Sequence, residues 1–235
     1  MKTVFIVGCY GQIGSILIEN LKDKYNIIGS DILDQIDASI HYYKCDATKY
    51  DQLETIFNTN RIDVVINLTG MVELPYVPSL EDYYMMVDCY LNSTFLLLTL
   101  MQKYGVNKMI LASSNHVTDY YEKNGNSILN RMINIYDYPI SKGVYGTLKL
   151  AAENLCRVFY LNFNIHSIAF RIGTYRNKYA KECFEERWNR TLLKTEDLVL
   201  YFEKAIEKDC GFKVFYLVSD NKDKPWDTTN LNYLK

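Results

Sequence analysis

The chain has 235 residues, of which 49% are hydrophobic and 23% are charged, so it is long enough to bury the core of one large domain. Its net charge of −2 and its pI of about 6.0 exclude a global basic field that would attract nucleic acid or an anionic membrane. The longest apolar run, Thr94–Met101, is far shorter than the roughly 20 residues that cross a bilayer.

The N-terminus and the cysteines indicate a cytoplasmic protein. One lysine followed by an apolar run resembles a short signal peptide, but Gly8, Gly11 and Gly14 interrupt the run and no small-residue cleavage site follows. We therefore interpret this run as a buried strand. The six cysteines are scattered singly, without C-x-x-C or metal-ligand spacing, which is typical of a reducing compartment and predicts no metal site.

Apolar runs without polar alternation recur along the chain, and amphipathic segments separate them. The runs are typical of strands buried on both faces of a parallel sheet: Thr3–Val7, Ile27–Ser30, Val64–Leu68, Lys108–Ala112, His166–Phe170 and Lys213–Leu217. The segments have helical periodicity: Gln12–Leu21, Asp51–Asn58, Tyr83–Tyr104, Tyr145–Asn162 and Thr195–Lys208. This alternation predicts an α/β fold with a Rossmann-type, doubly wound parallel sheet.

The chain shows no internal repeat, no low-complexity tract and only four prolines, so we expect residues 1–235 to form a single domain. The part after Arg171 is the most irregular and charged. We expect residues 171–235 to contribute a small substrate-binding cap over the carboxyl edge of the sheet.

The first strand runs directly into a glycine turn, Gly8-Cys9-Tyr10-Gly11-Gln12-Ile13-Gly14, which opens the first helix. One glycine permits the tight turn, one lets the backbone approach a pyrophosphate, and one lets the helix pack on the strand. The amide groups at the helix start, at Gln12 and Ile13, would then face the anion. The position between a strand and a helix makes the motif specific for a dinucleotide.

Carboxylates follow the next two strands. Asp31 ends the second strand, about where a ribose-binding carboxylate belongs. It would accept hydrogen bonds from a ribose 2′-hydroxyl and repel a 2′-phosphate, so it predicts NAD rather than NADP. The alternative role for Asp31 is that of a loop residue that caps the next turn. The third strand ends at Cys45-Asp46-Ala47, where Asp46 would either contact the adenine or cap the following helix.

Tyr145 and Lys149 lie four residues apart at the start of a predicted helix, so both side chains lie on one helical face. Oxidation of an alcohol requires removal of the hydroxyl proton, and the pKa of a free tyrosine, about 10, is too high for this at neutral pH. A neighbouring ammonium and the positive nicotinamide ring would lower this pKa and stabilise the phenolate. We expect Tyr145 to be the base.

Three neighbouring features bear on this assignment. A hydroxyl that orients the substrate oxygen is expected in Ser113-Ser114-Asn115-His116, at a strand end where α/β proteins bind ligands. Tyr138 and Lys142 also match Tyr-x-x-x-Lys, but Pro139 and Gly143 disfavour a helix there. His116 is an alternative base, but no carboxylate partner is evident for it, so we expect a structural or substrate-lining role.

Together these residues resemble the extended short-chain dehydrogenases/reductases of the NAD-dependent epimerase/dehydratase branch, over nearly the whole chain. The resemblance is carried by Gly8-x-x-Gly11-x-x-Gly14, Asp31, Asp46, Asn67-Leu68-Thr69-Gly70, Ser114, Tyr145-x-x-x-Lys149 and Glu153. Within the branch the chain is most similar to NAD-dependent uronate dehydrogenases, through Ala112–Val117, Tyr120-Tyr121, Arg171–Thr174, Ser219–Asn221 and Trp226-Asp227.

The resemblance implies an enzyme with NAD that oxidises a hexuronic acid at its anomeric carbon to an aldarolactone. It also implies a homodimer or higher homo-oligomer, built through the helices Tyr83–Tyr104 and Tyr145–Asn162. An arginine after Thr174 would bind the substrate acid group; Arg187 is our choice, and Arg176 and Arg190 are alternatives. The other implied roles are the base for Tyr145, the reacting oxygen for Ser114, the cofactor for Leu68, Thr69 and Gly70, and the sugar for Asn115, His116 and Thr174.

The chain departs from the family pattern at two positions, with Val72 in place of a serine and Tyr90 in place of an asparagine. A nucleotide-sugar epimerase or dehydratase that holds NAD tightly is an alternative, but only about 60 of the 235 residues follow Arg171, which favours a small substrate. A non-catalytic NAD(P)-sensing protein is a second alternative, which the complete set of Ser114, Tyr145 and Lys149 disfavours.

Overall fold

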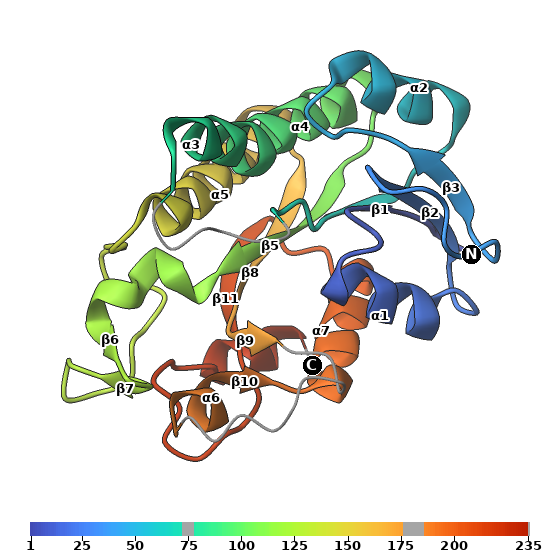
Figure 1. Cartoon of the computed structure of the whole chain (residues 1–235). Helices are drawn as coiled ribbons and strands as arrows, with labels where there is room; N and C mark the ends of the chain where they lie inside the picture. Colours follow the sequence, from blue (N-terminus) through green and yellow to red (C-terminus); the bar gives the residue numbers. More distant parts are fainter. Residues whose placement is uncertain (72–77, 176–185, 235) are drawn as a thin grey trace.

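A computed structural model of the chain describes residues 1–71, 78–175 and 186–234. Its centre is a seven-stranded sheet, parallel throughout, in the order β11-β8-β5-β4-β1-β2-β3 (Figure 1). The strands are β1 (Thr3–Val7), β2 (Asn26–Asp31), β3 (His41–Lys44), β4 (Val64–Asn67), β5 (Lys108–Ser114), β8 (His166–Ile172) and β11 (Phe212–Leu217). The Rossmann-type, doubly wound sheet expected from the sequence is confirmed.

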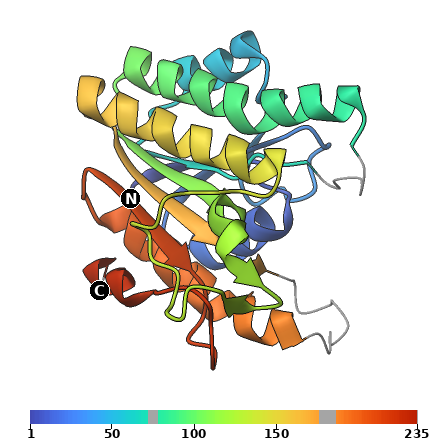
Figure 2. The same ribbon diagram turned by 90° about the vertical axis from the view of Figure 1, so that its left-hand side faces the viewer.

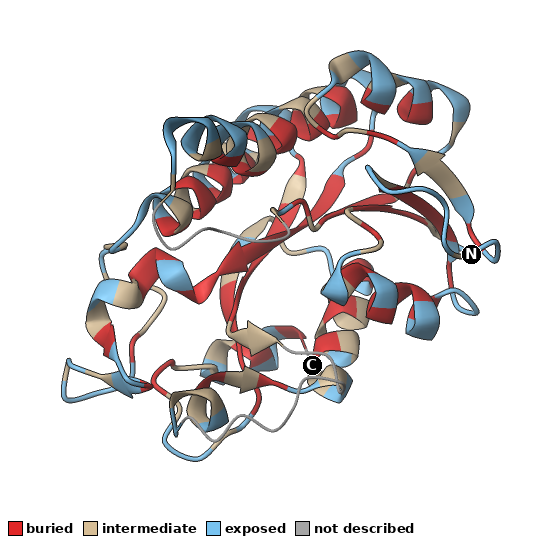
Figure 3. Ribbon diagram, in the orientation of Figure 1, coloured by how far each residue is buried: buried red, intermediate tan, exposed pale blue. Residues whose placement is uncertain are grey.

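Helices cover both faces of the sheet (Figures 1 and 2). One face packs on α1 (Gln12–Leu21) and α7 (Thr195–Glu207), and the other on α2 (Tyr50–Thr59), α4 (Ser93–Tyr104) and α5 (Val144–Phe163). Every residue of β4 and β5 is buried as a result, whereas the edge strand β3 has no buried residue (Figure 3). Burial on both faces explains why the central strands have continuous apolar runs.

The helix that the sequence places at Tyr83–Tyr104 begins earlier and contains a wider turn. It starts as α3 (Leu80–Met86), where Ser79 and Asp82 form a capping box, and continues through a π-helical segment, η1 (Val87–Asn92), into α4. Its 25 residues have a mean hydropathy of 1.2 in their most apolar window, enough for a membrane span by length and composition. Leu97, Leu98 and Leu100 are buried in the core between the sheet and α2, so we interpret it as a core helix.

Short elements gather beyond the carboxyl ends of the strands (Figure 1). They are the 3₁₀ segment η2 (Asn115–Tyr121), the hairpin β6 (Glu122–Lys123) and β7 (Asn126–Ser127), the pair β9 (Thr174–Tyr175) and β10 (Leu192–Leu193), and α6 (Glu186–Thr191). None of them has enough length for a periodic pattern, so the sequence does not predict them. The chain after Arg171 supplies several of these short elements and also α7 and β11 of the main layers.

Helix α5 approaches η2 closely at Gly146. A Cβ at this position would overlap the carbonyl oxygen of His116 and the hydroxyl of Ser141. The glycine therefore lets the first turn of α5 lie directly against the segment that follows β5. This contact places the neighbouring residue, Tyr145, at the carboxyl edge of the sheet.

We predict that Gly146→Ala destabilises the protein although alanine is the better helix former. The gain in helix propensity is about 1 kcal/mol, and an overlap with backbone in a packed region costs about 1–3 kcal/mol. Denaturant unfolding should show a net loss of free energy of unfolding. Gly143→Ala is the matched control, because a Cβ there meets no atom within 4 Å, and an equal loss in both variants would contradict the packing role.

Candidate active site

The glycine turn after β1 is shaped for the close approach of a ligand. Gly8 has a φ of 78°, which side-chain-bearing residues rarely adopt, and a Cβ there would lie 3.0 Å from the carbonyl oxygen of Leu68. A Cβ on Gly14 would overlap the backbone of Cys9, so α1 packs directly on the turn. Two of the three glycines are thus required by geometry.

The N-terminus of α1 is suited to bind an anion. The helix begins at Gln12, its N-cap Gly11 provides no side-chain hydrogen bond, and its first turn has no acidic residue. Within residues 1–71, 78–175 and 186–234, no side chain caps the amide groups of Gln12 and Ile13, and the helix dipole favours negative charge there. A pyrophosphate fits this position.

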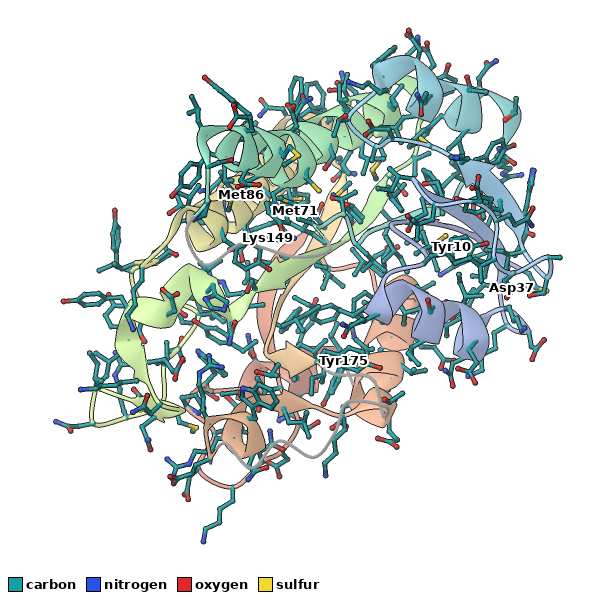
Figure 4. All side chains as sticks on the ribbon, in the orientation of Figure 1. Tyr10, Asp37, Met71, Met86, Lys149 and Tyr175 are labelled. Atoms are coloured by element: carbon teal, nitrogen blue, oxygen red, sulfur yellow. The ribbon has the colours of Figure 1, made fainter. Side chains whose placement is uncertain are left out.

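Asp31 lies at the end of β2 beside the glycine turn. Its carboxylate accepts hydrogen bonds from the backbone N–H groups of Tyr10 (3.0 Å) and Leu33 (3.3 Å). The Tyr10 ring stacks on Tyr42 with centroids 4.9 Å apart, and its hydroxyl accepts a bond from the amide of Asp37 (3.1 Å). Tyr10 and Asp37 thus lie at one end of the site, near the end of β2 (Figure 4).

Asp46 does not cap α2, because the N-cap of this helix is Lys49 and has no side-chain cap hydrogen bond; the Asp46 carboxylate instead forms a turn before the helix. Its Oδ1 accepts bonds from the amide (2.9 Å) and the hydroxyl (2.8 Å) of Thr48, and its own amide donates to Gln52 (2.7 Å). These contacts form the turn that leads into α2. Ala47 is buried in the core on the α2 side of the sheet, so only its backbone is available to a ligand.

A buried polar network holds the loop Leu68–Gly70 beside the glycine turn. The side-chain amide of Asn67 donates to the Thr94 hydroxyl (3.0 Å), and its Oδ1 accepts a hydrogen bond from the backbone N–H of Thr69 (3.0 Å). The Thr69 hydroxyl lies 3.0 Å from that of Ser93. Because every partner is buried, the network fixes the loop to β4 and α4.

Tyr145 and Ser114 meet at the carboxyl edge of the sheet. Tyr145 lies in the first turn of α5, Ser114 ends β5, and the Ser114 side chain is near enough to lower the pKa of Tyr145. Burial raises the pKa of Tyr145, and the neighbouring Ser114 opposes this rise only in part. Ser114 also lies 3.3 Å from Oδ1 of Asn115, so the three polar side chains form one cluster.

Lys149 lies one turn further along α5 and is buried. Its ammonium donates to the carbonyl oxygens of Ala112 (2.8 Å) and Thr69 (3.5 Å) and lies 5.9 Å from the centroid of the Tyr145 ring. Burial lowers the pKa of Lys149 to about 8, so the group is mostly charged at neutral pH and loses its charge above that value. In the folded chain, burial thus shifts the pKa of both Tyr145 and Lys149 more than the neighbouring groups do.

The structure separates the second Tyr-x-x-x-Lys match from this cluster. Tyr138 is 78% exposed and lies outside α5, and Lys142 donates to the carbonyl oxygen of Glu122 (2.9 Å). The helix context that favoured Tyr145 therefore distinguishes the two matches. Position in the fold, and not residue type, makes the difference.

His116 has a carboxylate partner that sequence reasoning missed. Its Nδ1 lies 2.9 Å from Oδ2 of Asp119, and its ring meets the Tyr145 ring in a T-shaped arrangement, with centroids 5.6 Å apart. The pKa of Asp119 is lowered, with the bond to His116 opposing the effect of burial, so an ionised carboxylate accepts from Nδ1–H. Nε2 is then the second ring nitrogen available to a ligand. Thr118, which lies between them, has non-helical φ and ψ of −130° and 24°, so the His-x-x-Asp spacing alone does not indicate the pair.

A buried ion pair lies beneath these residues. Glu153 and Arg171 form two hydrogen bonds of 2.9 and 3.0 Å, and Ser113 donates to Glu153 (2.5 Å). Arg171 also donates to the Tyr216 hydroxyl (3.3 Å), which lies 2.6 Å from that of Thr118. The network connects α5, β5, β8, β11 and η2 under the site.

Among the residues expected to bind the sugar, Thr174 follows strand β8, whereas Arg187 and Arg190 lie on α6 and pair with other side chains. Thr174 follows β8 two residues beyond Ile172, the partner of Ser114 in the sheet, and its hydroxyl lies 2.8 Å from that of Thr191. Arg187 on α6 instead pairs with the buried Glu122 (2.9 Å). Arg190 donates to Asn126 and pairs with Glu186. Val72 and Arg176 lie outside the described residues.

This combination of a parallel Rossmann sheet, a glycine turn and a Ser-Tyr-Lys cluster defines a dinucleotide-dependent oxidoreductase. The NAD dependent epimerase/dehydratase family model matches residues 4–194, so the chain belongs to this family and its cofactor is NAD. It is an enzyme of the sugar dehydrogenase and epimerase class.

Relatives match most of the chain, and a solved structure has the same fold. The chain is 36% identical over 228 residues to the uncharacterized protein YtbQ of Bacillus subtilis, covering 96% of this chain and 89% of that protein. It is 26% identical over 234 residues to a uronate dehydrogenase of Pseudomonas syringae (95% and 77%). A uronate dehydrogenase structure from Agrobacterium tumefaciens superposes with a TM-score of 0.82 at 22% identity, covering 100% of this chain and 83% of that chain.

The carboxylate of Asp31 generates a prediction about cofactor choice. We expect Asp31→Ala to weaken the preference for NAD over NADP by about tenfold or more, because it removes a charge that repels a 2′-phosphate. Binding of both cofactors by titration calorimetry measures this ratio. Asp34→Ala is the control, since that carboxylate is 90% exposed on the following loop. An unchanged ratio in Asp31→Ala would contradict the assigned role.

Proposed function

We propose that the chain is an NAD-dependent dehydrogenase that oxidises a hexuronic acid at its anomeric carbon and releases an aldarolactone. The observation that carries this proposal is the cluster of Ser114, Tyr145 and Lys149 beside the glycine turn. The segment Ser114-Asn115-His116 and the similarity to uronate dehydrogenases over 95% of the chain support the choice of substrate.

Each residue of the cluster has a role in this reaction. Ser114 donates a hydrogen bond to the anomeric oxygen, and Tyr145 takes its proton. The glycine turn and the loop Leu68–Gly70 would hold NAD, which would supply the hydride acceptor for the anomeric carbon as the carbonyl of the lactone forms. Lys149 holds a positive charge near Tyr145 and favours the phenolate at neutral pH.

We place the sugar between η2 and the elements that follow β8. Asn115 and Thr174 would contact its hydroxyls, and Nε2 of His116 would face it on the side of Tyr145. Arg187 would bind the acid group, as a guanidinium has five N–H donors and the pair with Glu122 uses only part of them. Residues 171–235 would thereby contribute the substrate-binding cap.

Two further properties belong to this proposal. The described cysteines, Cys9, Cys45, Cys89, Cys156 and Cys210, are free thiols, which supports a cytoplasmic location. Exposed apolar side chains on α4 and α5, including Phe95 (46%), Leu161 (71%) and Phe163 (45%), support a homodimer or higher homo-oligomer.

The test is formation of NADH by the purified protein with galacturonate or glucuronate, followed by absorbance. We expect turnover with an acid sugar and much less with galactose or glucose. Tyr145→Phe should reduce kcat by about 10²–10⁴-fold, with little change in NAD affinity, because it removes the base. Tyr138→Phe is the control. NAD retained through purification without NADH formation would favour an epimerase, and loss of activity in Tyr138→Phe alone would overturn the choice of base.

The role of Arg187 is tested with a variant that avoids a buried unpaired charge. In the double variant Arg187→Met/Glu122→Gln, we expect KM for the hexuronate to rise about tenfold or more, since a charge-assisted bond is lost. The kcat should change little, and KM for a neutral sugar should not rise. Arg190→Met is the matched control on the same helix. Equal changes for acid and neutral sugars would indicate a structural role only.

A further inference from the structure

Several elements enclose the ammonium of Lys149, and among the residues that the structure describes few bring negative charge. The carbonyl oxygens of Ala112 and Thr69 accept from it at 2.8 and 3.5 Å. On its own helix it meets the ring of Tyr145 and, one turn later, Glu153, whose carboxylate is engaged by Arg171. The segment η1 contributes Cys89 and Tyr90. Neither carbonyl carries a full charge, so the cation has incomplete compensation for its lost hydration.

Tyr90 presents its ring face to the ammonium. The Lys149 ammonium lies 4.7 Å from the ring centroid, within the range of a cation–π interaction. The same ring contacts Tyr145 in a T-shaped arrangement, with centroids 5.1 Å apart. Tyr90 itself is 4% exposed, so all of these contacts are shielded from water.

The backbone and the hydroxyl of Tyr90 hold the ring in place. Tyr90 lies in the π-helical segment η1, where the amide of Ser93 bonds to the carbonyl oxygen of Asp88, five residues back. Its hydroxyl accepts a hydrogen bond from the amide of Met71 (3.2 Å), in the loop after β4. Met71 and Met86 pack with Tyr90 in one apolar cluster, and Figure 4 labels these two methionines near Lys149 of α5. The ring is therefore fixed between the helical segment η1 and the loop after β4.

We propose that Tyr90 is a positioning residue, whose ring keeps the Lys149 ammonium charged and aligned with Tyr145. This inference rests on the proposed function, because it concerns the charge that activates the base. It assigns a role to the aromatic side chain that stands where the family pattern has an asparagine. An aromatic face stabilises a cation without carrying a negative charge that would also repel the phenolate of Tyr145.

The sign of the effect follows from the charge states. The aromatic face stabilises the protonated form of Lys149 alone, so its removal lowers the pKa of Lys149 below the present value of about 8. Lys149 is charged below its pKa and neutral above it. A variant without the ring would therefore lose the charge at a lower pH, inside the neutral range. The alkaline limb of the pH profile of kcat would shift in the same direction.

The experiment titrates Lys149 directly, by the ¹³Cε chemical shift of labelled lysines in the whole protein, with Lys149→Met to identify the signal. We expect Tyr90→Met to lower the pKa of Lys149 by about one pH unit. Tyr90→Phe should keep the wild-type value, because it keeps the ring and loses only the bond to Met71. Tyr84→Met, a substitution of a 65% exposed tyrosine on α3, is the matched control and should leave the titration unchanged.

A second substitution covers the case in which Tyr90→Met does not fold. Pentafluorophenylalanine in place of Tyr90 keeps the shape of the ring and removes the negative charge from its face, so it should also lower the pKa of Lys149. An unchanged or raised pKa in a folded ring-deficient variant would overturn the proposal. Because the titration needs neither substrate nor NAD, it decides the role of Tyr90 even if no hexuronate is oxidised.

Discussion

The buried ion pair between Glu153 and Arg171 joins the elements on which the site is built. Tyr145, Lys149 and Glu153 follow one another at four-residue intervals, so one face of α5 carries the base, the cation and the anchor. The anchor binds Arg171 of β8 and Ser113 of β5, directly before Ser114. Loss of one partner would leave an uncompensated charge, at a cost of about 3–5 kcal/mol. The pair thus sets how α5 lies against the strand ends.

The parallel sheet determines where the cofactor and the reacting groups meet. Its strand order reverses between β1 and β4, and the loops that follow these two strands lie side by side. The contact that a Cβ on Gly8 would make with Leu68 shows how close they are. Carboxyl ends at such a reversal form the crevice where open α/β sheets bind ligands. The glycine turn and the loop Leu68–Gly70 are therefore brought together by topology alone.

Burial opposes the protonation states that the chemistry needs. It raises the pKa of Tyr145 and lowers that of Lys149, so both neutral forms are favoured in the folded chain. The chain offsets this with dipoles and ring faces: the carbonyl oxygens of Ala112 and Thr69 and the ring of Tyr90 at Lys149, and the side chain of Ser114 at Tyr145. A carboxylate placed directly on Lys149 would fix its charge more strongly but would weaken its effect on the phenolate.

The sequence by itself determined the fold class and the local motifs, because both depend on short-range patterns. Continuous apolar runs marked the buried strands, the glycines marked the turn after β1, and the helix context separated Tyr145 from Tyr138. Only the tertiary structure decided the partners, because these come from distant segments. The pairing of Arg187 with Glu122, 65 residues away, and the seat of Lys149 against Tyr90 depend on how strands and helices pack. Even the nearby pair of His116 and Asp119 required the 3₁₀ turn that follows β5, which no periodic pattern indicates.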